Sequence, residues 1–585
     1  MTSRADILET MLAPKTLADV AAWLANNTDL PSRRKADLAS ALSTMSKITG
    51  KPLEHLPAHV GEIRRLIDQK SPAECGMKTA SHRNFKSRIF KLLKKAGCRV
   101  VPARHREPLS PEWQALWVAL NEFRRLRYDL SHVMHWHAAN GIPPEAAGAA
   151  TFEAYHRDTV EFGTKEHRHA YYKQACIAWN RASEKIAPWP KTTVPVPMRR
   201  KAKARPWPEL DPRLESEAQA YLASLGTPSS ATAAAQTPSS RPWRSVSSGK
   251  KKRKLLRDGT IKRREFDIRL YTSMALKLGF RSDQLTSLRD LVSTAVAGRV
   301  IDDLWEKAGK KPTTHIASFA WMIRGIAEHW VNVDPEHLAE LSKICAFVEP
   351  ERGGMTPENR ARLDQVQDPT RELALRWLPN NLAARAGKSK IRSRLTARTM
   401  MNACMVGLLI YCPMRRHNLA ALRLDRHIRR IPKGKATMMV IEIPGAEVKN
   451  GVPTRYPVPA EIAAMIDEYV AHYRLLICPN DCPWLFPTSG GKPVHRNAVS
   501  ARIKKLIHLE TGLRWNPHLF RHWGGVTYLE EEPGQYEIMR RVYHHDTQET
   551  SRRYLGNESE AAVRRYQETI LKRRTRLTTL GRIEP

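Results

Sequence analysis

Residues 516–522 read Asn-Pro-His-Leu-Phe-Arg-His, a stretch with the residue types of a helix N-terminus. Asn516 is a good helix N-cap, and Pro517 suits the first turn of a helix, where a missing N–H costs no hydrogen bond. His518 and Arg521 are three residues apart and would therefore share one helical face. Because the N-terminus of a helix is electropositive, this face predicts a site for an oxyanion or a phosphate. A His-x-x-Arg spacing is common, however, and does not by itself identify a catalytic pair.

Chemically capable side chains lie on both sides of this stretch. Downstream, residues 542–546 read Val-Tyr-His-His-Asp and residues 550–554 read Thr-Ser-Arg-Arg-Tyr. Upstream, the apolar run Met400–Met414 is too short to span a bilayer and predicts a buried helix. Residues 413–424 follow as Pro-Met-Arg-Arg-His-Asn-Leu-Ala-Ala-Leu-Arg-Leu, so two arginines come directly after the buried helix.

A β-hairpin is predicted between these segments. Residues 436–443 and 454–458 are rich in β-branched and apolar side chains, and residues 450–451 between them are Asn-Gly. An Asn-Gly pair between two strand-like runs is a strong turn signal because both residues tolerate positive φ. Lys449 directly precedes this pair, so its ammonium group is expected near the tip of the hairpin.

The order of these elements, Arg, Lys, His-x-x-Arg, His and Tyr, resembles the catalytic domain of the tyrosine recombinases, the phage integrase family. The resemblance covers residues 356–570 and includes five separated elements. The segments His-Leu-Phe-Arg-His, Pro-Gly-Gln-Tyr-Glu and Arg-Arg-Tyr-Leu-Gly look like those of recombinases from bacterial plasmids and mobile elements. The resemblance implies DNA integration or transposition, and a bacterial cytoplasmic protein associated with the nucleoid.

The resemblance also implies a role for each residue at one scissile phosphate. Tyr554 would be the nucleophile and would form a 3′-phosphotyrosyl link while a 5′-hydroxyl leaves. Arg415 and Arg521 would hold the non-bridging oxygens, because a planar guanidinium suits bidentate phosphate contact. Lys449 would protonate the leaving oxygen, and His518 would assist proton transfer from the tyrosine or donate a hydrogen bond to the phosphate. Neither a metal nor ATP nor another cofactor is implied.

Several assignments keep a rival. Arg416 competes with Arg415, although the leucine-rich stretch that follows favours Arg415. The family usually has Gly at the position of Pro413 and often an acidic residue at that of Asn418, so this sequence departs from the family pattern at the turn. For the general acid, Lys433 and Lys435 compete with Lys449, and the Val-Lys-Asn-Gly setting favours Lys449.

The histidine and the tyrosine near the C-terminus have rivals too. The family pattern Leu-Gly-His fits His544 if Val542 is used as the reference, and fits His545 if the usual gap to the tyrosine is used. We favour His544 slightly and keep both. Tyr543 and Tyr566 compete with Tyr554, which the spacing from the histidines favours.

The charge of the chain agrees with a polyanionic partner. The 585 residues contain 97 Lys and Arg and 59 Asp and Glu, a formal net charge of +38. Nucleic acid is the first reading and an anionic membrane surface the second, and small cationic substrates are disfavoured. Because no amphipathic membrane-binding segment is visible, we expect double-stranded DNA and no membrane.

Other features bound the class of protein. No signal peptide is visible at Met1–Leu12, and the 8 cysteines fit a reduced intracellular protein rather than a disulfide framework. Cys478 and Cys482 lack a second pair that would complete a zinc site. The histidines at positions 132, 135, 137, 167 and 169 form clusters that we interpret as helix residues rather than metal ligands.

The fold class predicted is mainly α with a small antiparallel β-sheet in the C-terminal domain. Residues 1–106 form an N-terminal helical region, and residues 107–187 form a helical, DNA-binding-like module that begins after the N-cap Ser110. Residues 188–264 are a Pro/Ser-rich and basic linker, residues 265–350 a helical core-binding-like domain, and residues 351–585 the catalytic domain. Helical periodicity supports the helical modules, and composition supports the linker.

The function expected is site-specific DNA recombination by dimers that pair into tetramers on DNA, as the resemblance implies. Two alternatives remain open. A type IB topoisomerase-like enzyme would use similar chemistry to relax supercoils as a monomer. A catalytically inactive DNA-binding or architectural protein would lack the chemistry, although the set Arg415, Lys449, His518, Arg521 and Tyr554 argues against it.

Overall fold

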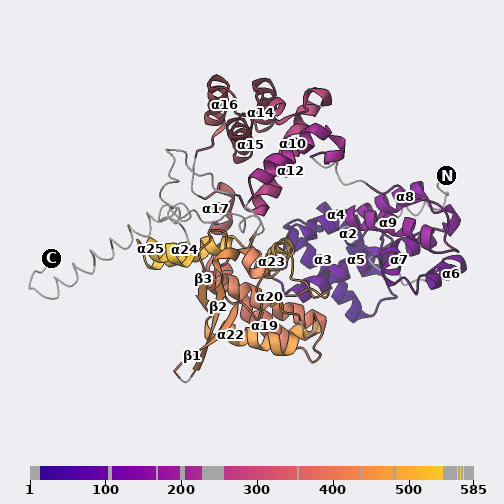
Figure 1. The fold of residues 1–585 in the computed structure, drawn as a ribbon. Coiled ribbons are helices and arrows are strands. Elements are labelled where there is room, and N and C mark those ends of the chain that lie inside the picture. Colours follow the sequence, from indigo (N-terminus) through magenta and orange to yellow (C-terminus); the bar gives the residue numbers. More distant parts are fainter. Residues whose placement is uncertain are drawn as a thin grey trace, which may run out of the picture. The chain divides into compact units, whose positions relative to one another are not determined.

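The computed structural model describes residues 14–102, 108–165, 169–197, 204–226, 256–351, 355–434, 436–478 and 482–543, with residues 563, 567 and 571. The chain divides into two compact units, residues 1–196 together with 353–585, and residues 197–352. Its described part is mainly α-helical and contains one three-stranded antiparallel sheet in the C-terminal region. The predicted fold class is therefore confirmed (Figure 1).

The N-terminal helices surround a small core of their own. Leu17, Val20 and Leu24 are buried, as the apolar spacing predicts. Thr16 caps the first helix, since its hydroxyl accepts a hydrogen bond from the N–H of Asp19 and the Asp19 carboxylate accepts one from the N–H of Thr16. The elements of this core are α2 (Leu17–Asn26), α3 (Ser32–Thr49), η1 (Leu53–His55), α4 (Val60–Asp68) and α5 (Thr79–Lys95).

A second core follows in residues 108–196. The predicted helix start is confirmed, because Ser110 is the N-cap residue and Pro111 opens the helix. Trp113 and Trp179 are buried and lie 6.1 Å apart between ring centroids. The elements are α6 (Pro111–Ala119), α7 (Arg124–Ala139), η2 (Pro144–Ala146), α8 (Ala149–Phe162) and α9 (His169–Lys185).

Arg64 joins these two cores. Its guanidinium is buried and donates from Nη1 to the carbonyl oxygen of Gly163 at 2.5 Å and from Nη2 to that of Val160 at 2.7 Å. These carbonyls belong to the C-terminal end of α8, where backbone oxygens lack intrahelical partners and the helix dipole favours a cation. Gly61 allows the approach, because a Cβ there would collide with the carbonyl oxygen of Glu161.

Residues 197–352 form the second unit, with one continuous core. Within the range 188–264 predicted as linker, the structure differs from the expectation, because α10 (Pro212–Ser224) is a helix with Leu214 and Tyr221 buried. Residues 227–255 lie outside the described residues. The elements of the unit are η3 (Trp207–Glu209), α10, α12 (Asp258–Lys277), η5 (Ser282–Gln284), α13 (Leu288–Leu291), α14 (Thr294–Lys307), α15 (Thr314–Ile326), η6 (Ala327–Val331) and α16 (Pro335–Val348).

The C-terminal region is built around one buried helix. The predicted helix start at Thr356 is confirmed, since its hydroxyl accepts a hydrogen bond from the N–H of Asn359 and Pro357 is the first helical residue. Most of the apolar run that begins at Met400 lies in α20, and its apolar residues from Met400 to Leu409 are buried, as predicted. The helices are α17 (Pro357–Asp364), η7 (Gln365–Gln367), α18 (Pro369–Arg376), α19 (Leu378–Gly387), α20 (Arg394–Tyr411), α21 (Arg416–Ala420), α22 (Ala460–Glu468), η9 (Tyr469–Tyr473), η10 (Arg474–Leu476), α23 (Arg496–Thr511), α24 (Leu519–Glu531) and α25 (Tyr536–Tyr543).

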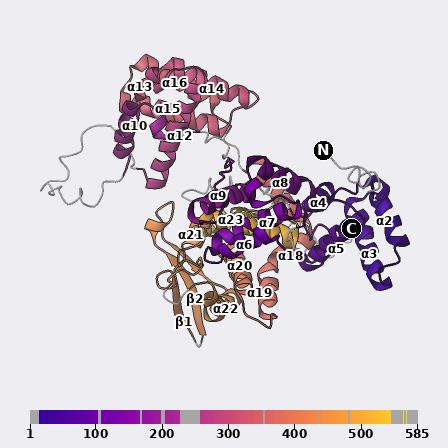
Figure 2. The ribbon, with the colours of Figure 1, turned by 90° about the vertical axis from the view of Figure 1, so that its right-hand side faces the viewer.

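The sheet has the order β1-β2-β3, with β1 (Ile428–Lys433), β2 (Ala436–Ile443) and β3 (Thr454–Pro457). Both pairs are antiparallel, and Ile443 on β2 faces Thr454 on β3. The predicted pairing of the second and third strands is thus confirmed, while β1 was not predicted. The connection between β2 and β3 is longer than a two-residue turn and contains η8 (Gly445–Glu447). The strands and α22, which packs against β2, are seen together in Figure 2.

No helix among the residues that the structure describes combines the length and the apolar character needed to cross a bilayer.

The joint at Arg64 yields a prediction. Replacing Arg64 by Ala leaves buried carbonyls without their charged donor, and we expect the free energy of unfolding of the N-terminal region to fall by about 2 kcal/mol. Hydrogen exchange measured by mass spectrometry should show faster exchange in α4 and at the end of α8. The control is Arg65→Ala, because the neighbouring Arg65 is exposed and its ion pair with Glu62 spans 3.9 Å. Equal effects of the two substitutions would contradict this account.

Candidate active site

Arg521 is the central side chain of the candidate site. It lies in the first turn of α24 and is only 2% exposed. Nη1 donates a hydrogen bond to the carbonyl oxygen of Pro413, and Nη2 donates to that of Tyr543 at 2.9 Å. The guanidinium carbon also lies 4.7 Å from the centre of the Tyr543 ring, a cation–π contact. Arg521 thereby connects the turn after α20 with the end of α25.

Part of the Arg521 charge remains without a partner. Its Nε is buried and makes no hydrogen bond in the structure. The partners of this buried cation are carbonyl oxygens, the Tyr456 hydroxyl and the Tyr543 ring, none of which carries a full negative charge. A negative group beside Arg521 would therefore reduce the desolvation cost of its charge.

A small hollow brings the two predicted arginines together. Its cavity volume is about 10 Å³, enough for about one water molecule. The described residues that line it include no carboxylate; they are Met414, Arg415, Asn418, Ile443, Val448, Thr454, Tyr456, Arg521 and Tyr543. Two guanidinium groups at a hollow without acidic side chains create a positive potential that favours an anion.

The structure also distinguishes Arg415 from its rival. Arg415 is half-buried, precedes the first residue of α21 as its N-cap, and lines the hollow. Arg416 is exposed and does not line it. Hydrogen bonds hold the turn that carries Arg415 at two points. The carbonyl of Pro413 accepts from Arg521, and the carbonyl of Arg415 accepts from the N–H of Leu419 at 3.1 Å.

Tyr456 is a site residue that the sequence interpretation missed. It lies on β3, is buried and lines the hollow with both arginines. Burial raises the pKa of its hydroxyl to about 12, although the positive charges of Arg521 and Arg415 lower it. Its phenol therefore stays protonated and can donate a hydrogen bond. Alternation along the predicted strand could have found it, because Thr454 and Tyr456 fall on the same, buried face.

His518 is the N-cap residue of α24, which begins two residues later than a cap at Asn516 would suggest. Asn516 accepts a hydrogen bond from the N–H of His518 at 2.9 Å, but the helix begins only at Leu519. The imidazole keeps an exposed part and makes an edge contact with His522, with 4.9 Å between ring centroids. Partial burial, together with the nearby charges of His522, Arg521, Arg415 and Arg416, lowers the pKa of His518 to about 4.

Lys449 is exposed and lies in the connection between β2 and β3. The preceding residue, Val448, is buried and lines the hollow, which brings the backbone at Lys449 close to the arginines. Its rival Lys433 is the last residue of β1 and faces Ala436 across the β1–β2 turn. The other rival, Lys435, lies outside the described residues.

The remaining predicted residues are at or beyond the end of the described region. His544, His545 and Tyr554 lie outside the described residues, and so does the rival Tyr566. The other rival, Tyr543, is buried with its ring against Arg521. Its position makes it a structural support of Arg521.

The residues considered as metal ligands have other partners. Among the described residues no group of three His, Cys, Asp or Glu side chains could hold a metal ion. His132 contacts the Tyr155 hydroxyl at 2.9 Å, and the buried His137 contacts that of Thr151 at 3.0 Å. Cys478 and Cys482 are both buried and neither forms a disulfide, and the Cys482 thiol donates a hydrogen bond to the carbonyl oxygen of Gly491 at 3.6 Å. The side chains of His167 and His169 are not among those described.

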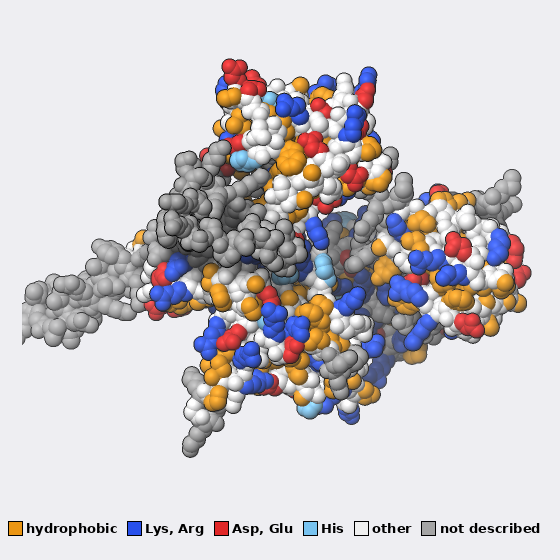
Figure 3. Space-filling model, in the orientation of Figure 1, with side chains coloured by type: hydrophobic (Ala, Val, Ile, Leu, Met, Phe, Trp, Pro, Cys, Tyr) orange, Lys and Arg blue, Asp and Glu red, His pale blue; other side chains and the backbone are white. Residues whose placement is uncertain are grey.

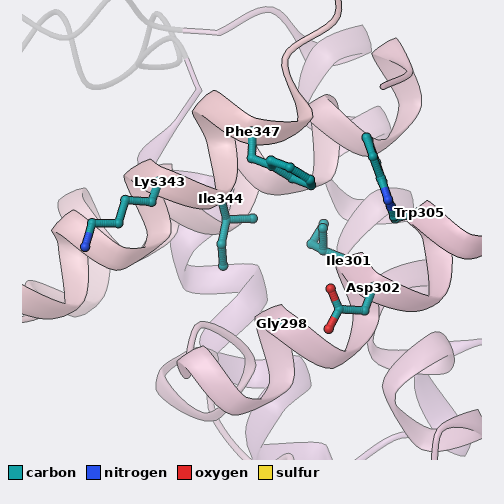
Figure 4. A pocket seen from close by; sticks show the side chains of 7 residues that line it. All are labelled: Gly298, Ile301, Asp302, Trp305, Lys343, Ile344 and Phe347. Carbon is teal, nitrogen blue, oxygen red and sulfur yellow. The ribbon is translucent and has the colours of Figure 1, made fainter. Parts of the chain in front are cut away.

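Larger hollows occur in the second unit, but they lack this combination of residues. One lies between α14 and α16, has a cavity volume of about 260 Å³ and is lined by Gly298, Ile301, Asp302, Trp305, Lys343, Ile344 and Phe347. Figure 4 shows Trp305 of α14 and Phe347 of α16 among the side chains that line it. A single lysine and a single aspartate do not form an anion receptor like that at Arg521.

The low pKa of His518 gives a testable pH dependence. Folding lowers this pKa from 6.5 to about 4, so the unfolded chain binds the proton at higher pH than the folded protein. His518 thus reduces the stability of the folded state as the pH falls from 6.5 toward 4, and not above that range. Nuclear magnetic resonance titration of the free protein should give a midpoint near pH 4 for the imidazole signal that is lost in His518→Gln. A midpoint near 6.5 would contradict the burial and charge argument.

The chain matches one protein family model and is similar to several solved structures. Residues 389–560 match the model of the phage integrase family. Among solved structures, the chain is similar to XerH site-specific recombinase bound to difH substrate, at 14% identity over 52% of this chain and 78% of that chain, with a TM-score of 0.32. It is also similar to a lambda integrase dimer bound to a COC′ core site, at 14% identity over 52% and 90% with a TM-score of 0.31.

A third similar structure is the Tn1549 transposon integrase in complex with transposon right end DNA, at 13% identity over 54% of this chain and 95% of that chain, with a TM-score of 0.33. No curated protein matches the chain. The family model covers every predicted site residue from Arg415 to Tyr554. Residues 389–560 are therefore a phage integrase family domain.

Proposed function

We propose that the protein is a site-specific DNA recombinase that cuts and rejoins DNA through a covalent 3′-phosphotyrosyl intermediate. The observation that carries the proposal is the pair Arg415 and Arg521 at one hollow without carboxylates, inside the phage integrase family domain. Two preformed guanidinium groups can hold the two non-bridging oxygens of a phosphodiester and stabilise the charge that develops in the transition state.

The proposed step balances without a metal or a nucleotide. The Tyr554 oxygen attacks phosphorus, a Tyr–O–P bond forms, and the bond between phosphorus and the 5′-oxygen breaks. The tyrosine proton passes to a base, and the leaving 5′-oxygen receives a proton. Because the phosphodiester is exchanged for another phosphodiester, the released hydroxyl or one from a second strand can reverse the attack.

Two further side chains suit these proton transfers. His518 is neutral at neutral pH because of its low pKa, so its ring nitrogen can accept a proton or a hydrogen bond. Lys449 is exposed and carries a proton that it can give to the leaving oxygen. His544 or His545 would add a hydrogen bond to the phosphate.

We further propose that basic surface on the helical modules holds duplex DNA. Lys and Arg side chains are spread over the face that Figure 3 shows. On α5, Arg83, Lys91 and Lys95 are exposed, and residues 83 and 91 are two helical turns apart on one face. Such a row of cations suits the phosphates of a duplex and gives the N-terminal helical region, residues 1–106, a role in DNA binding.

The alternatives differ in what they would do with the same phosphate. A type IB topoisomerase-like enzyme would relax supercoils as a monomer, whereas we propose dimers that pair into tetramers for strand exchange. Trapping a complex that contains two duplexes separates the two enzymes. An inactive architectural protein would bind DNA and form no covalent bond.

The chemistry is tested with a nicked suicide substrate that carries the DNA site found next to the gene. Wild-type protein should form a covalent protein–DNA adduct, because the short fragment diffuses away and prevents religation. Tyr554→Phe should form none, and Tyr566→Phe should behave as wild type. The adduct is measured by denaturing gel electrophoresis. An adduct with Tyr554→Phe, or none with the wild type, would refute the assignment.

The DNA-binding role of α5 is tested by the salt dependence of affinity. The double substitution Arg83→Ala and Lys91→Ala should reduce the magnitude of the slope of log K against log salt by roughly 2 if both residues contact phosphates. The control on the same helix is Lys86→Ala with Arg88→Ala, because these cations already pair with Asp68 and with Asp37. An equal change in slope for both variants would contradict a specific role of the exposed row.

A further inference from the structure

We propose that Glu447 is a positioning residue that holds Lys449 for protonation of the leaving oxygen. This inference rests on the proposed function. Glu447 lies two residues before Lys449, at the end of η8. It does not line the hollow and is not one of the residues that would touch the phosphate.

Both carboxylate oxygens of Glu447 are engaged. Oε2 lies 3.0 Å from Nε2 of His427, and Oε1 lies 2.6 Å from Nη2 of Arg426. His427 is 2% exposed, so one end of this connection is inside the protein. The carboxylate thus fastens an otherwise exposed connection to the segment before β1.

The contacts of His427 show which of its ring nitrogens carries the proton in the neutral form. Its Nδ1 accepts a hydrogen bond from the N–H of Arg423 at 3.0 Å, which leaves the ring proton on Nε2. Nε2–H therefore donates to Glu447 when the ring is neutral. The carbonyl of His427 accepts from the N–H of Glu442 at 2.8 Å, which fixes the backbone of this residue to β2.

The backbone of the connection is held by a second, independent contact. Asn418 donates from Nδ2 to the carbonyl oxygen of Glu447 at 3.1 Å. Asn418 is buried, lines the hollow and follows Arg415 by three residues in the turn and helix that carry this arginine. One side chain therefore sets the distance between the Arg415 segment and the Lys449 segment.

The connection also has a fixed internal shape. The N–H of Glu447 donates to the carbonyl of Pro444 at 2.9 Å, and that of Gly451 donates to the carbonyl of Val448 at 3.1 Å. A Cβ at Gly445 would collide with the carbonyl oxygen of Gly451, so the chain folds back on itself closely. With Val448 buried, Lys449 projects from a defined position although its own side chain is exposed.

Position matters because proton transfer requires contact. The lysine nitrogen must reach the 5′-oxygen while the bond between phosphorus and that oxygen breaks, and the proton passes from nitrogen to oxygen. A displacement of about 1 Å in a catalytic group can cost roughly 100-fold in rate. Loss of the Glu447 carboxylate would release the connection and place Lys449 less often in reach.

The test compares two leaving groups in the full-length protein. One suicide substrate carries the ordinary phosphodiester, and the other carries sulfur in place of the bridging 5′-oxygen at the scissile bond. A thiolate leaves without a proton because a thiol is far more acidic than an alcohol. Glu447→Ala should cut the ordinary substrate about 10- to 100-fold more slowly than wild type, with unchanged DNA affinity. It should cut the sulfur substrate within about threefold of the wild-type rate.

Three variants make the result specific. Asn418→Ala should show the same pattern, because it releases the same connection through the backbone. Glu447→Gln should retain most activity, since its amide oxygen still accepts from His427. Glu442→Ala removes a carboxylate from the same sheet, where it is 42% exposed and contacts Arg429 and Arg455, and should cut both substrates normally.

The outcomes separate this inference from the proposed function. If Lys449→Ala is slow on the ordinary substrate and Glu447→Ala is not, Glu447 does not position Lys449. If Glu447→Ala is equally slow on both substrates, its role is general folding rather than placement of the acid. If sulfur fails to rescue Lys449→Ala itself, then Lys449 is not the general acid, and both the proposed role and this inference fall.

Discussion

The burial of one cation organises the candidate site. Arg521 is buried, and its two terminal nitrogens donate hydrogen bonds to the carbonyl oxygens of Pro413 and Tyr543. Pro413 lies in the turn after α20, and Tyr543 is the last residue of α25. Carbonyl dipoles stabilise a guanidinium less than a carboxylate does, so the buried charge stays only partly compensated. The turn that carries Arg415, the start of α24 and the end of α25 must all keep their places for these bonds to exist. The same requirement that fixes the fold here leaves a positive site for an anion.

The lysine segment is fixed by a different type of interaction. Around Arg521 the protein uses a buried charge and backbone oxygens, whereas at Glu447 it uses a carboxylate between a buried imidazole and an exposed arginine. The first arrangement is rigid because every partner is buried. The second lies at the surface, where single contacts contribute little, and it depends on the combination with Asn418. The Arg521 segment and the Lys449 segment are thus held by different kinds of contact.

The sequence predicted those helices and strands that are determined by residues close together in the chain. The cap at Thr356 and the strands 436–443 and 454–458 follow from residue type and spacing, and the structure has them. Strand β1 was missed because Arg429, Arg430 and Pro432 give the segment little strand propensity. It forms a strand because its backbone pairs with β2, which the local sequence does not indicate. Helix α10 was missed because Pro- and Ser-rich neighbours dominate the composition of its range, while its apolar residues pack against distant helices.

In the candidate site too, residues that belong to a sequence motif were predicted, and residues defined by contacts distant in sequence were missed. Arg415 and Arg521 were found from motif and order, and the structure brings them to one hollow. Tyr456 and Glu447 were missed because their importance arises only from contacts with residues that are distant in sequence. His518 adds a consequence that no motif contains: burial and its cationic neighbours lower its pKa, so it is neutral at neutral pH. A phosphate bound between the arginines would offset their charge and raise that pKa again, since an opposite charge nearby favours the protonated imidazole. Substrate binding and the protonation of His518 are therefore coupled, and by linkage each favours the other.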